Sequence, residues 1–342
     1  NLFILFIDNI NKFNPIPSQP INATNPCGEQ PLNHGESCVL GSINLSNFII
    51  NSDIDYDRLK YIVHKAVRFL DDTIDLNKYP TDTIRESSRK NRKIGLGVMG
   101  YADMLIKLGM SYASEDAVKF ADQLMNFINK EAYVASVELG KEKGNFPNFE
   151  NSIFATKNSK SHKRTKHLRN ATRTTIAPTG TISIIAGVSG GIEPIFAFEY
   201  SRESVGDKVN LDWIHPLYKE ELDKNGGKLP KELHNVYVSA PEIDPDYHVK
   251  MQYAFQMHTD NACSKTINLP AKTAIKTIRQ IYEWAHTLGL KGITVFRDGC
   301  RHGKQVLHNR MEKCPECGKY TAVSQENCVT CISCGWSKCD IK

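Results

Sequence analysis

Long helical patterns alternate with short apolar runs through most of this sequence of 342 residues. Apolar side chains recur at helical spacing over residues 57–77, and residues 115–143, 246–258 and 271–288 also have a helical pattern. Asp55 or Asp57 is placed to cap the first of these helices. The β-branched residues Thr174, Thr175 and Ile176 and the short run at 293–296 are typical of strands. Strands separated by helices predict an α/β fold with parallel strands.

The first residues predict a strand rather than a targeting signal. Residues 1–7 are apolar but too short to span a membrane, and they lack a basic flank and a cleavage site. No apolar run elsewhere approaches the roughly 20 residues that a membrane span requires. The chain does not begin with Met, so we expect it to be a piece of a longer polypeptide. The net charge of +5 is mild, and its densest part, residues 157–173, is either a solvated loop or a local attractant for phosphate.

The cysteines are concentrated at the C-terminus. Six of the ten lie in residues 314–342, which favours a metal site or redox tail in a reducing cytoplasm over a secreted disulfide framework. Cys314 and Cys317 form one C-x-x-C knuckle, and Cys328 and Cys331 form a second. Paired knuckles at this spacing are typical of a zinc ribbon. Six thiols exceed the four that tetrahedral zinc needs, which leaves two for redox chemistry.

A second group of reactive residues lies at Asn25-Pro26-Cys27-Gly28-Glu29. The proline and the glycine hold the thiol of Cys27 on a stiff, narrow turn. Residues two apart in an extended segment point the same way, so Asn25, Cys27 and Glu29 can face one substrate together. The alternative is that Cys27 is a small buried apolar residue and Glu29 a surface charge.

Two glycine-containing motifs suggest phosphate binding. The hydroxyls and free N–H groups around Thr179-Gly180-Thr181 fit an anion site if a helix begins there, although the same tripeptide also occurs in ordinary turns. Residues 182–188 after it are apolar, and we expect them to be buried. Gly95, Gly97 and Gly100 have the G-x-G-x-x-G spacing, but residues 89–93 before them do not form a strand core. We therefore interpret these glycines as sites of close packing at a helix start.

Several ordered segments together resemble the catalytic subunits of ribonucleotide reductases. They are residues 25–32, 36–45, 92–100, 169–172, 177–183, 191–194, 260–270 and 291–297. The sequence of residues 264–268 and the cysteine-rich tail resemble the adenosylcobalamin-dependent (class II) branch. The resemblance runs from about residue 7 to the C-terminus. It implies part of a ten-stranded α/β barrel over 1–298, namely the second half-barrel with its finger loop, then a linker over 299–313 and a zinc-ribbon-like redox tail over 314–342.

The resemblance also implies roles for the residues around Cys27. Cys27 matches the thiyl radical that takes a hydrogen atom from C3′ of the ribose. Glu29 matches the carboxylate that accepts the proton of the 3′-hydroxyl, and Asn25 matches the amide that orients the sugar. Cys38 matches one member of the dithiol that delivers two electrons and becomes a disulfide. Its partner cysteine belongs to the N-terminal half of the family's barrel, which is absent here.

In the tail, the resemblance implies a dithiol that re-reduces the active site by exchange. Cys334 and Cys339 fit this role, which assigns Cys314, Cys317, Cys328 and Cys331 to zinc. The other partition leaves Cys328 and Cys339 as the dithiol, since Cys334 also ends in a Cys-Gly pair like Cys317. We favour the first partition, but the sequence fits both.

The remaining implied sites concern substrate and cofactor. Residues of the substrate-phosphate loop are Pro178, Thr179, Gly180, Thr181, Ile182 and Ser183. Residues implied near adenosylcobalamin are Glu193, Pro194 and Phe196. An adjacent tyrosine pair, found in large subunits that take their radical from a second protein, does not occur in this sequence.

The expected function is therefore reduction of ribonucleotides, as diphosphates, to 2′-deoxyribonucleotides for DNA synthesis. The expected partners are a thioredoxin- or glutaredoxin-like reductant, the missing N-terminal half and a second copy in a homodimer. We expect neither a membrane nor a nucleic acid as partner. The alternatives are a class I large subunit that needs a radical-bearing partner, a zinc-ribbon nucleic-acid-binding protein, which the few basic residues of the tail disfavour, and a truncated, inactive fragment.

Overall fold

The chain forms two compact units. The computed structural model describes residues 2–155, 165–203, 210–299, 312–313, 315–316, 320–325, 328–331 and 336–339. The first unit comprises residues 1–196 and 230–300, and the second comprises residues 197–229 and 301–342. Residues 197–229 thus interrupt the first unit in sequence, and the domain boundaries at 298 and 314 stay predictions.

A mostly parallel sheet runs through the first unit. β4 (Val39–Asn44) pairs in parallel with β7 (Ile94–Met99). Isolated parallel bridges then join Leu96 to Thr174 and Ile176 to Cys263. β10 (Thr266–Leu269) pairs in parallel with β11 (Gly292–Arg297), whose other side carries the antiparallel β1 (Leu2–Leu5). The predicted α/β class with parallel strands is confirmed, as are the strands expected at the start of the chain and at 293–296.

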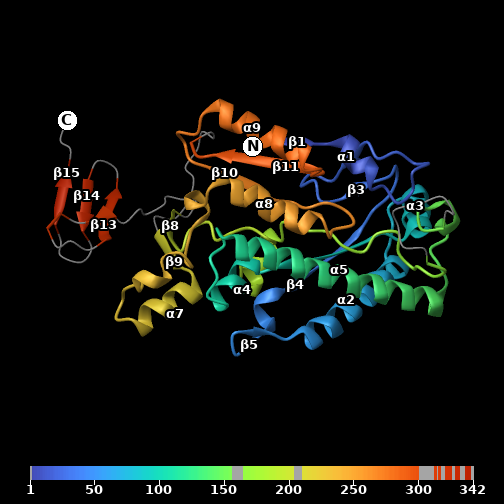
Figure 1. The fold of residues 1–342 in the computed structure, drawn as a ribbon, viewed down its shortest axis with the longest axis horizontal. Helices are drawn as coiled ribbons and strands as arrows, with labels where there is room; N and C mark the ends of the chain where they lie inside the picture. The colour runs from blue at the N-terminus through green and yellow to red at the C-terminus, as the bar shows by residue number, and fades with distance from the viewer. Residues whose placement is uncertain are drawn as a thin grey trace. The chain divides into compact units, whose positions relative to one another are not determined.

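Helices cover one face of this sheet. α2 (Tyr56–Leu76) packs on β4 and β7, and α9 (Ile275–Thr287) packs on β11. α5 (Glu115–Lys143) lies against both α2 and α8 (Pro245–Gln256), as Figure 1 shows. The Asp55 side chain accepts a hydrogen bond of 2.9 Å from the Arg58 N–H, which confirms it as the cap of α2. The apolar stripe of α2 is buried at Leu59, Val63, Val67, Leu70 and Ile74.

Shorter elements connect this framework. The helices are α1 (Ile7–Lys12), α3 (Asp82–Asn91), α4 (Tyr101–Lys107) and α6 (Gly180–Ala186). The short strands are β2 (Ala23–Thr24), β3 (Pro31–Leu32), β5 (Ile49–Ile50) and β6 (Asp53–Ile54). Single 3-10 turns occupy Leu45–Phe48, Phe149–Asn151, Lys231–Leu233 and Ala240–Glu242. None of the helices in the described part of the chain is long and apolar enough to cross a membrane.

The second unit contains a hairpin, a helix and a small sheet. β8 (Glu199–Glu203) pairs with β9 (Asn210–Ile214), and α7 (Pro216–Lys224) follows. β12 (Glu312–Lys313), β13 (Tyr320–Gln325), β14 (Cys328–Cys331) and β15 (Ser337–Cys339) form an antiparallel sheet in chain order.

Two expectations about packing are wrong. Residues 182–188 are not a buried segment, because Ile184 and Ile185 on the short helix α6 are each 80% exposed. The close packing expected of Gly95, Gly97 and Gly100 is confirmed and Gly100 begins α4, but Gly95 and Gly97 lie inside β7 rather than at a helix start. The strand needs glycine there, since a Cβ on Gly97 would lie 2.2 Å from the Thr175 carbonyl oxygen. A dinucleotide-binding loop would place its glycines after the strand, so the position of Gly95 and Gly97 within β7 argues against that interpretation, as expected.

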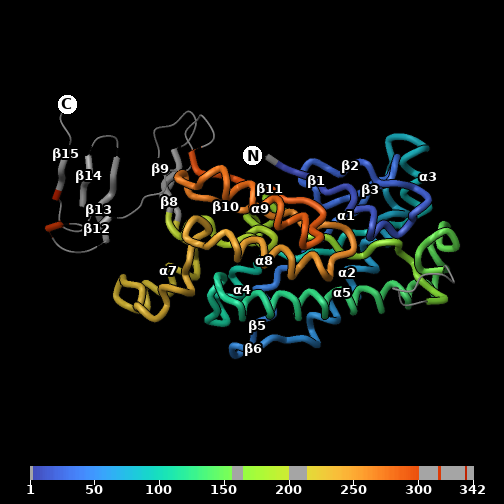
Figure 2. The backbone as a smooth tube through the Cα atoms, turned by 45° about the horizontal axis from the view of Figure 1, so that its top comes forward, coloured from blue at the N-terminus to red at the C-terminus, as the bar shows by residue number. Residues whose placement is uncertain are grey.

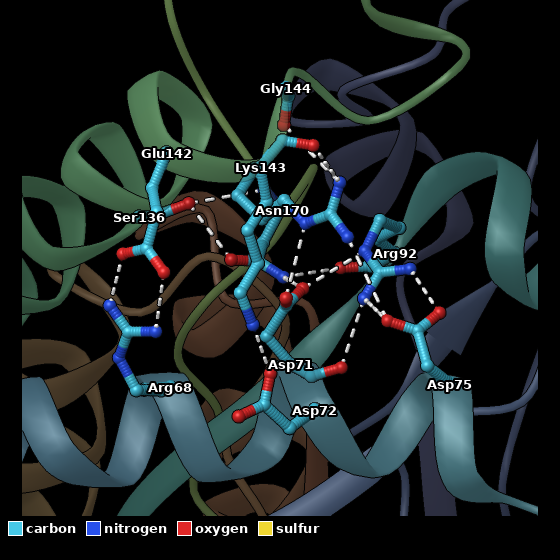
Figure 3. A network of polar contacts seen from close by, with 11 residues as sticks. Arg68, Asp71, Asp72, Asp75, Arg92, Ser136, Glu142, Lys143, Gly144 and Asn170 are labelled. Carbon is cyan, nitrogen blue, oxygen red and sulfur yellow. Dashed lines mark hydrogen bonds and ion pairs between the residues drawn. The ribbon is translucent and has the colours of Figure 1, made fainter.

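A buried ionic network fixes the entry into β7 (Figure 3). Asp71 on α2 is fully buried and accepts from Arg92 Nε at 2.9 Å and from Arg169 Nε at 3.1 Å. Asn170 Nδ2 donates to the same carboxylate at 2.9 Å. Arg92 has a positive φ of 46° and also binds the Asp75 carboxylate through two N–H groups at 2.8 Å. The network ties α2 to the segments that precede β7 and the isolated bridges at Thr174 and Ile176, where the sequence predicted a strand.

Candidate active site

A β-hairpin presents the Asn25–Glu29 motif. β2 and β3 pair antiparallel, and residues 25–30 form the tip. The Asn25 carbonyl accepts from the Gly28 N–H, and Asn25 Oδ1 accepts from the Gln30 N–H, both at 3.0 Å. Gly28 has a φ of +80°, and a Cβ there would lie 1.9 Å from Cζ of Phe3. Only glycine fits this position, so the narrow turn predicted around Cys27 is confirmed. Figure 2 shows the hairpin close to β1, which carries Phe3.

The hairpin tip is anchored on the sheet through Glu29. Its carbonyl accepts from the Ala262 N–H at 3.0 Å and from Thr175 Oγ1 at 2.8 Å. The Glu29 side chain is only 3% exposed, and its Oε2 has no hydrogen-bond partner among the residues that the structure describes. A buried carboxylate oxygen without a donor is costly unless a ligand or water pairs with it. The interpretation of Glu29 as a surface charge is therefore wrong.

Two thiols lie within the electrostatic reach of Glu29. Cys27 at the tip is exposed rather than buried, and partial desolvation together with the Glu29 charge raises its pKa. Cys38 lies just before β4 with its Sγ 3.5 Å from the Lys93 carbonyl oxygen, and burial raises its pKa strongly, despite the nearby Lys93 ammonium. Both groups are therefore thiols at neutral pH. That state suits exchange of a hydrogen atom better than attack as a thiolate nucleophile.

A buried ion pair supports the segment of Cys38. Lys93 Nζ lies 2.7 Å from both Glu36 Oε2 and Asn33 Oδ1, and its side chain is almost wholly buried. The sequence interpretation missed this pair, because an isolated Lys or Glu is normally a surface residue. The only signal in the sequence was that Glu36 lies two residues before Cys38, within the segment 36–45 that resembles the family.

The predicted phosphate loop begins helix α6. Thr179 has a φ of 55°, which is uncommon for a β-branched residue and marks a constrained site. Its Oγ1 accepts from the Gly191 N–H at 2.7 Å, and its carbonyl accepts from the Ser183 N–H at 2.9 Å. Gly180, Thr181 and Ile182 are exposed in the first turn, where N–H groups have no partner within the helix.

The phosphate loop is near the hairpin tip. Thr175 contacts Glu29 directly, and four residues of chain, which span at most about 14 Å, separate it from Thr179. Thr179 therefore lies within about 14 Å of the residue that holds the Glu29 carbonyl.

The residues expected near a cofactor behave differently from one another. Glu193 Oε2 accepts from Lys265 Nζ at 2.7 Å, and its Oε1 accepts from the Thr266 N–H at 2.6 Å. Burial lowers the pKa of Lys265, whereas the charge of Glu193 and its hydrogen bond raise that pKa. Both Glu193 oxygens are thus engaged in holding β10. Pro194 is buried, whereas Phe196 is exposed at the surface.

The tail is described mainly by its backbone. Cys314, Cys317 and Cys334 lie outside the described residues, and no group of metal-ligating side chains occurs within the described part. The register of β14 and β15 places Cys328 directly opposite Cys339. This pair is the dithiol of the second partition.

Comparisons with known proteins identify the family of this chain. The family model "Ribonucleotide reductase, barrel domain" matches residues 1–296. The chain is 44% identical over 330 residues to the vitamin B12-dependent ribonucleoside-diphosphate reductase of Mycobacterium tuberculosis, with 91% of the chain and 46% of the relative covered. It is also 44% identical over 315 residues to the protein of the same name from Thermoplasma acidophilum, with 86% and 40% covered. The chain thus spans less than half the length of these curated relatives.

A more distant relative and a solved structure extend the comparison. The ribonucleoside-diphosphate reductase subunit alpha of Chlamydia pneumoniae is 30% identical over 302 residues, with 74% of the chain and 29% of the relative covered. The solved structure of the Actinobacillus ureae class Id ribonucleotide reductase alpha subunit has a TM-score of 0.72 at 22% identity, covering 87% of this chain and 58% of that one. This structural match concerns the fold. With the family model matching most of the chain, the protein belongs to the ribonucleotide reductase family, of which it carries the barrel domain.

Proposed function

We propose that the natural protein containing this chain reduces ribonucleoside diphosphates to 2′-deoxyribonucleoside diphosphates by a thiyl-radical mechanism. The observation that carries the proposal is the hairpin tip, where Cys27 exposes its thiol and the buried Glu29, whose Oε2 has no partner among the described residues, is close enough for its charge to raise the pKa of both Cys27 and Cys38. The names of the most similar relatives support diphosphates as the substrate class.

The residues of the site fit each step of such a reaction. Cys27, as a thiyl radical, takes the hydrogen atom from C3′ and becomes a thiol. The Glu29 carboxylate accepts the proton of the 3′-hydroxyl, and the 2′-hydroxyl leaves as water. Cys38 and a second thiol, expected on a part of the family's sequence that this chain does not span, supply two electrons and two protons and become a disulfide. Glu29 then returns its proton to the 3′-oxygen, and Cys27 returns the hydrogen atom to C3′ and is again a thiyl radical.

Residues 182–196 fit a large cofactor with apolar edges. Ile184 and Ile185, which are neighbours on α6, expose apolar side chains, as does Phe196, and we propose that together they form an apolar surface for a ligand, since a contiguous exposed apolar patch marks such a site. When bound, adenosylcobalamin would supply the first radical by homolysis of its cobalt–carbon bond. Phe196 and the two isoleucines are the residues we propose to hold it, because both oxygens of Glu193 are already engaged.

We expect turnover to depend on adenosylcobalamin. The natural protein, given a ribonucleoside diphosphate and a dithiol reductant, should release the deoxynucleotide only when this cofactor is added, as measured by chromatography of the products. A class I large subunit would instead need a second, radical-bearing protein. Turnover without cobalamin but with such a partner would contradict the assignment to the cobalamin branch.

We propose that the tail combines a zinc site with a redox pair. The register supports Cys328 and Cys339 as the dithiol, because opposite residues in antiparallel strands have Cα atoms about 4.5–5.5 Å apart, within the range of a disulfide. Cys314, Cys317, Cys331 and Cys334 would then supply the four thiolates that zinc prefers.

Zinc analysis of variants tests this partition. The natural protein should contain about one zinc ion per tail, and Cys314→Ser should remove it while Cys328→Ser retains it. Loss of zinc in Cys328→Ser but retention in Cys334→Ser would favour the partition in which Cys334 and Cys339 form the dithiol.

A further inference from the structure

The glutamine that follows Glu29 has a buried side chain without a partner. Gln30 is 2% exposed, and neither its Oε1 nor its Nε2 has a hydrogen-bond partner among the described residues. An unpaired buried donor and acceptor destabilise the unliganded fold, because both groups lose their bonds to water. Such groups are rare in native proteins and call for a ligand, an ion or an ordered water.

The Gln30 amide lies on the inner face of the sheet. A Cβ built on Gly95 would lie 2.7 Å from Gln30 Nε2, 2.5 Å from Leu40 Cδ2 and 2.7 Å from Thr175 Cγ2. Glycine at position 95 therefore makes room for the amide between these two neighbouring side chains. The opposite face of β4 packs on α2, since a Cβ on Gly41 would contact Leu70 at 3.5 Å.

The same face carries the proposed chemistry. Side chains two residues apart in a strand point the same way, so Cys38, two positions before Leu40, shares the face of the Gln30 amide. Glu29, whose Oε2 is also without a partner in the described chain, is the adjacent residue. Glu29 and Gln30 thus bring a carboxylate oxygen, an amide oxygen and an amide NH₂ group to the hairpin, all buried and without a partner in the described chain.

These atoms are complementary to a vicinal diol. One hydroxyl can donate to the carboxylate, and the next can accept from the amide NH₂ group while donating to the amide oxygen. We propose that Gln30 binds the 2′-hydroxyl of the substrate ribose beside the 3′-hydroxyl held by Glu29. This inference rests on the proposed function. It makes Gln30 a determinant of substrate over product, because the product lacks the 2′-oxygen.

Binding of matched nucleotides to the natural protein tests the proposal without turnover. Calorimetry would compare the four common ribonucleoside diphosphates with their 2′-deoxy counterparts, in the absence of cofactor and reductant. The wild type should bind its preferred ribonucleotide about tenfold more tightly than the deoxynucleotide. Gln30→Met, which keeps the length without the amide, should remove this preference by weakening the ribonucleotide only. Gln30→Glu, which keeps the shape but loses the NH₂ donor, should do the same.

A matched control separates this role from a structural one. Gln252 on α8 is also buried with an unpartnered Oε1 in the described chain, but its Nε2 donates to the Gly292 carbonyl at 2.8 Å. Gln252→Met should lower the melting temperature and leave the ribonucleotide preference intact. Gln30→Met should leave the melting temperature of the unliganded protein unchanged or raise it, because it removes unpaired polar atoms.

The outcomes distinguish the role of Gln30 from the proposed function of the whole site. A preference for ribonucleotides that persists in both Gln30 variants would overturn the role of Gln30, and so would a fall in melting temperature with an unchanged preference. A wild type that binds none of the diphosphates would count against the proposed function itself.

Discussion

Cys27→Ser is expected to lower nucleotide reduction by the natural protein about 10⁴-fold or more, with substrate affinity retained. A serine O–H bond is much stronger than a thiol S–H bond, so an oxygen at this position cannot exchange a hydrogen atom reversibly with C3′. Cys27 is exposed at the hairpin tip, and none of the described contacts that hold the tip uses its side chain. The substitution should therefore leave the fold intact. Product formation and equilibrium binding of a ribonucleoside diphosphate are the two measurements.

Cys38→Ser is the matched control for this prediction. It removes the other thiol whose pKa the Glu29 charge raises. The proposed role of Cys38, however, is to supply electrons after the radical step. The reaction should then stop before reduction is complete, while hydrogen exchange at C3′, followed with deuterium-labelled substrate, persists. Exchange in Cys27→Ser at the wild-type rate would refute the assignment of Cys27 as the hydrogen-atom acceptor.

Much of the fold follows from local patterns in the sequence. The stripe of α2, its cap Asp55 and the limits of α5 were predictable because each depends on neighbours within a few turns. The narrow hairpin turn at Gly28 was predictable for the same reason. The parallel strands followed from the helices between them. These features need no knowledge of which distant segments meet.

The features that sequence missed depend on distant partners. Glu36 and Lys93 are 57 positions apart, and their burial becomes visible only when β4 and β7 pair. The run of isoleucines at 182–185 has the composition of a core segment, yet α6 is short and leaves Ile184 and Ile185 exposed. Gln30 was overlooked because it differs from other glutamines only in lacking hydrogen bonds to the described chain, and no sequence pattern reveals that.

Asp71→Asn is expected to lower the free energy of unfolding by about 3–5 kcal/mol, because it leaves buried guanidinium groups without their counter-charge. Asp71 is fully buried and receives Arg92, Arg169 and Asn170 on its two oxygens (Figure 3). An asparagine amide has only one oxygen, so its NH₂ group would face a donor from one of these partners. Chemical denaturation of the natural protein measures the loss.

Asp72→Asn provides the control. Asp72 follows Asp71 on α2 and also pairs with a basic side chain, but at the surface of the protein. Asp72 pairs with Lys143 and its side chain is 43% exposed, so its loss should cost only about 0–1 kcal/mol. Added salt should shrink the Asp72 effect and leave the Asp71 effect nearly unchanged, since buried pairs are screened much less. Equal costs for the two variants would show that Arg92 and Arg169 find other acceptors or water. In that case Asp75, which already binds Arg92 through both oxygens, would be sufficient to hold the entry into β7.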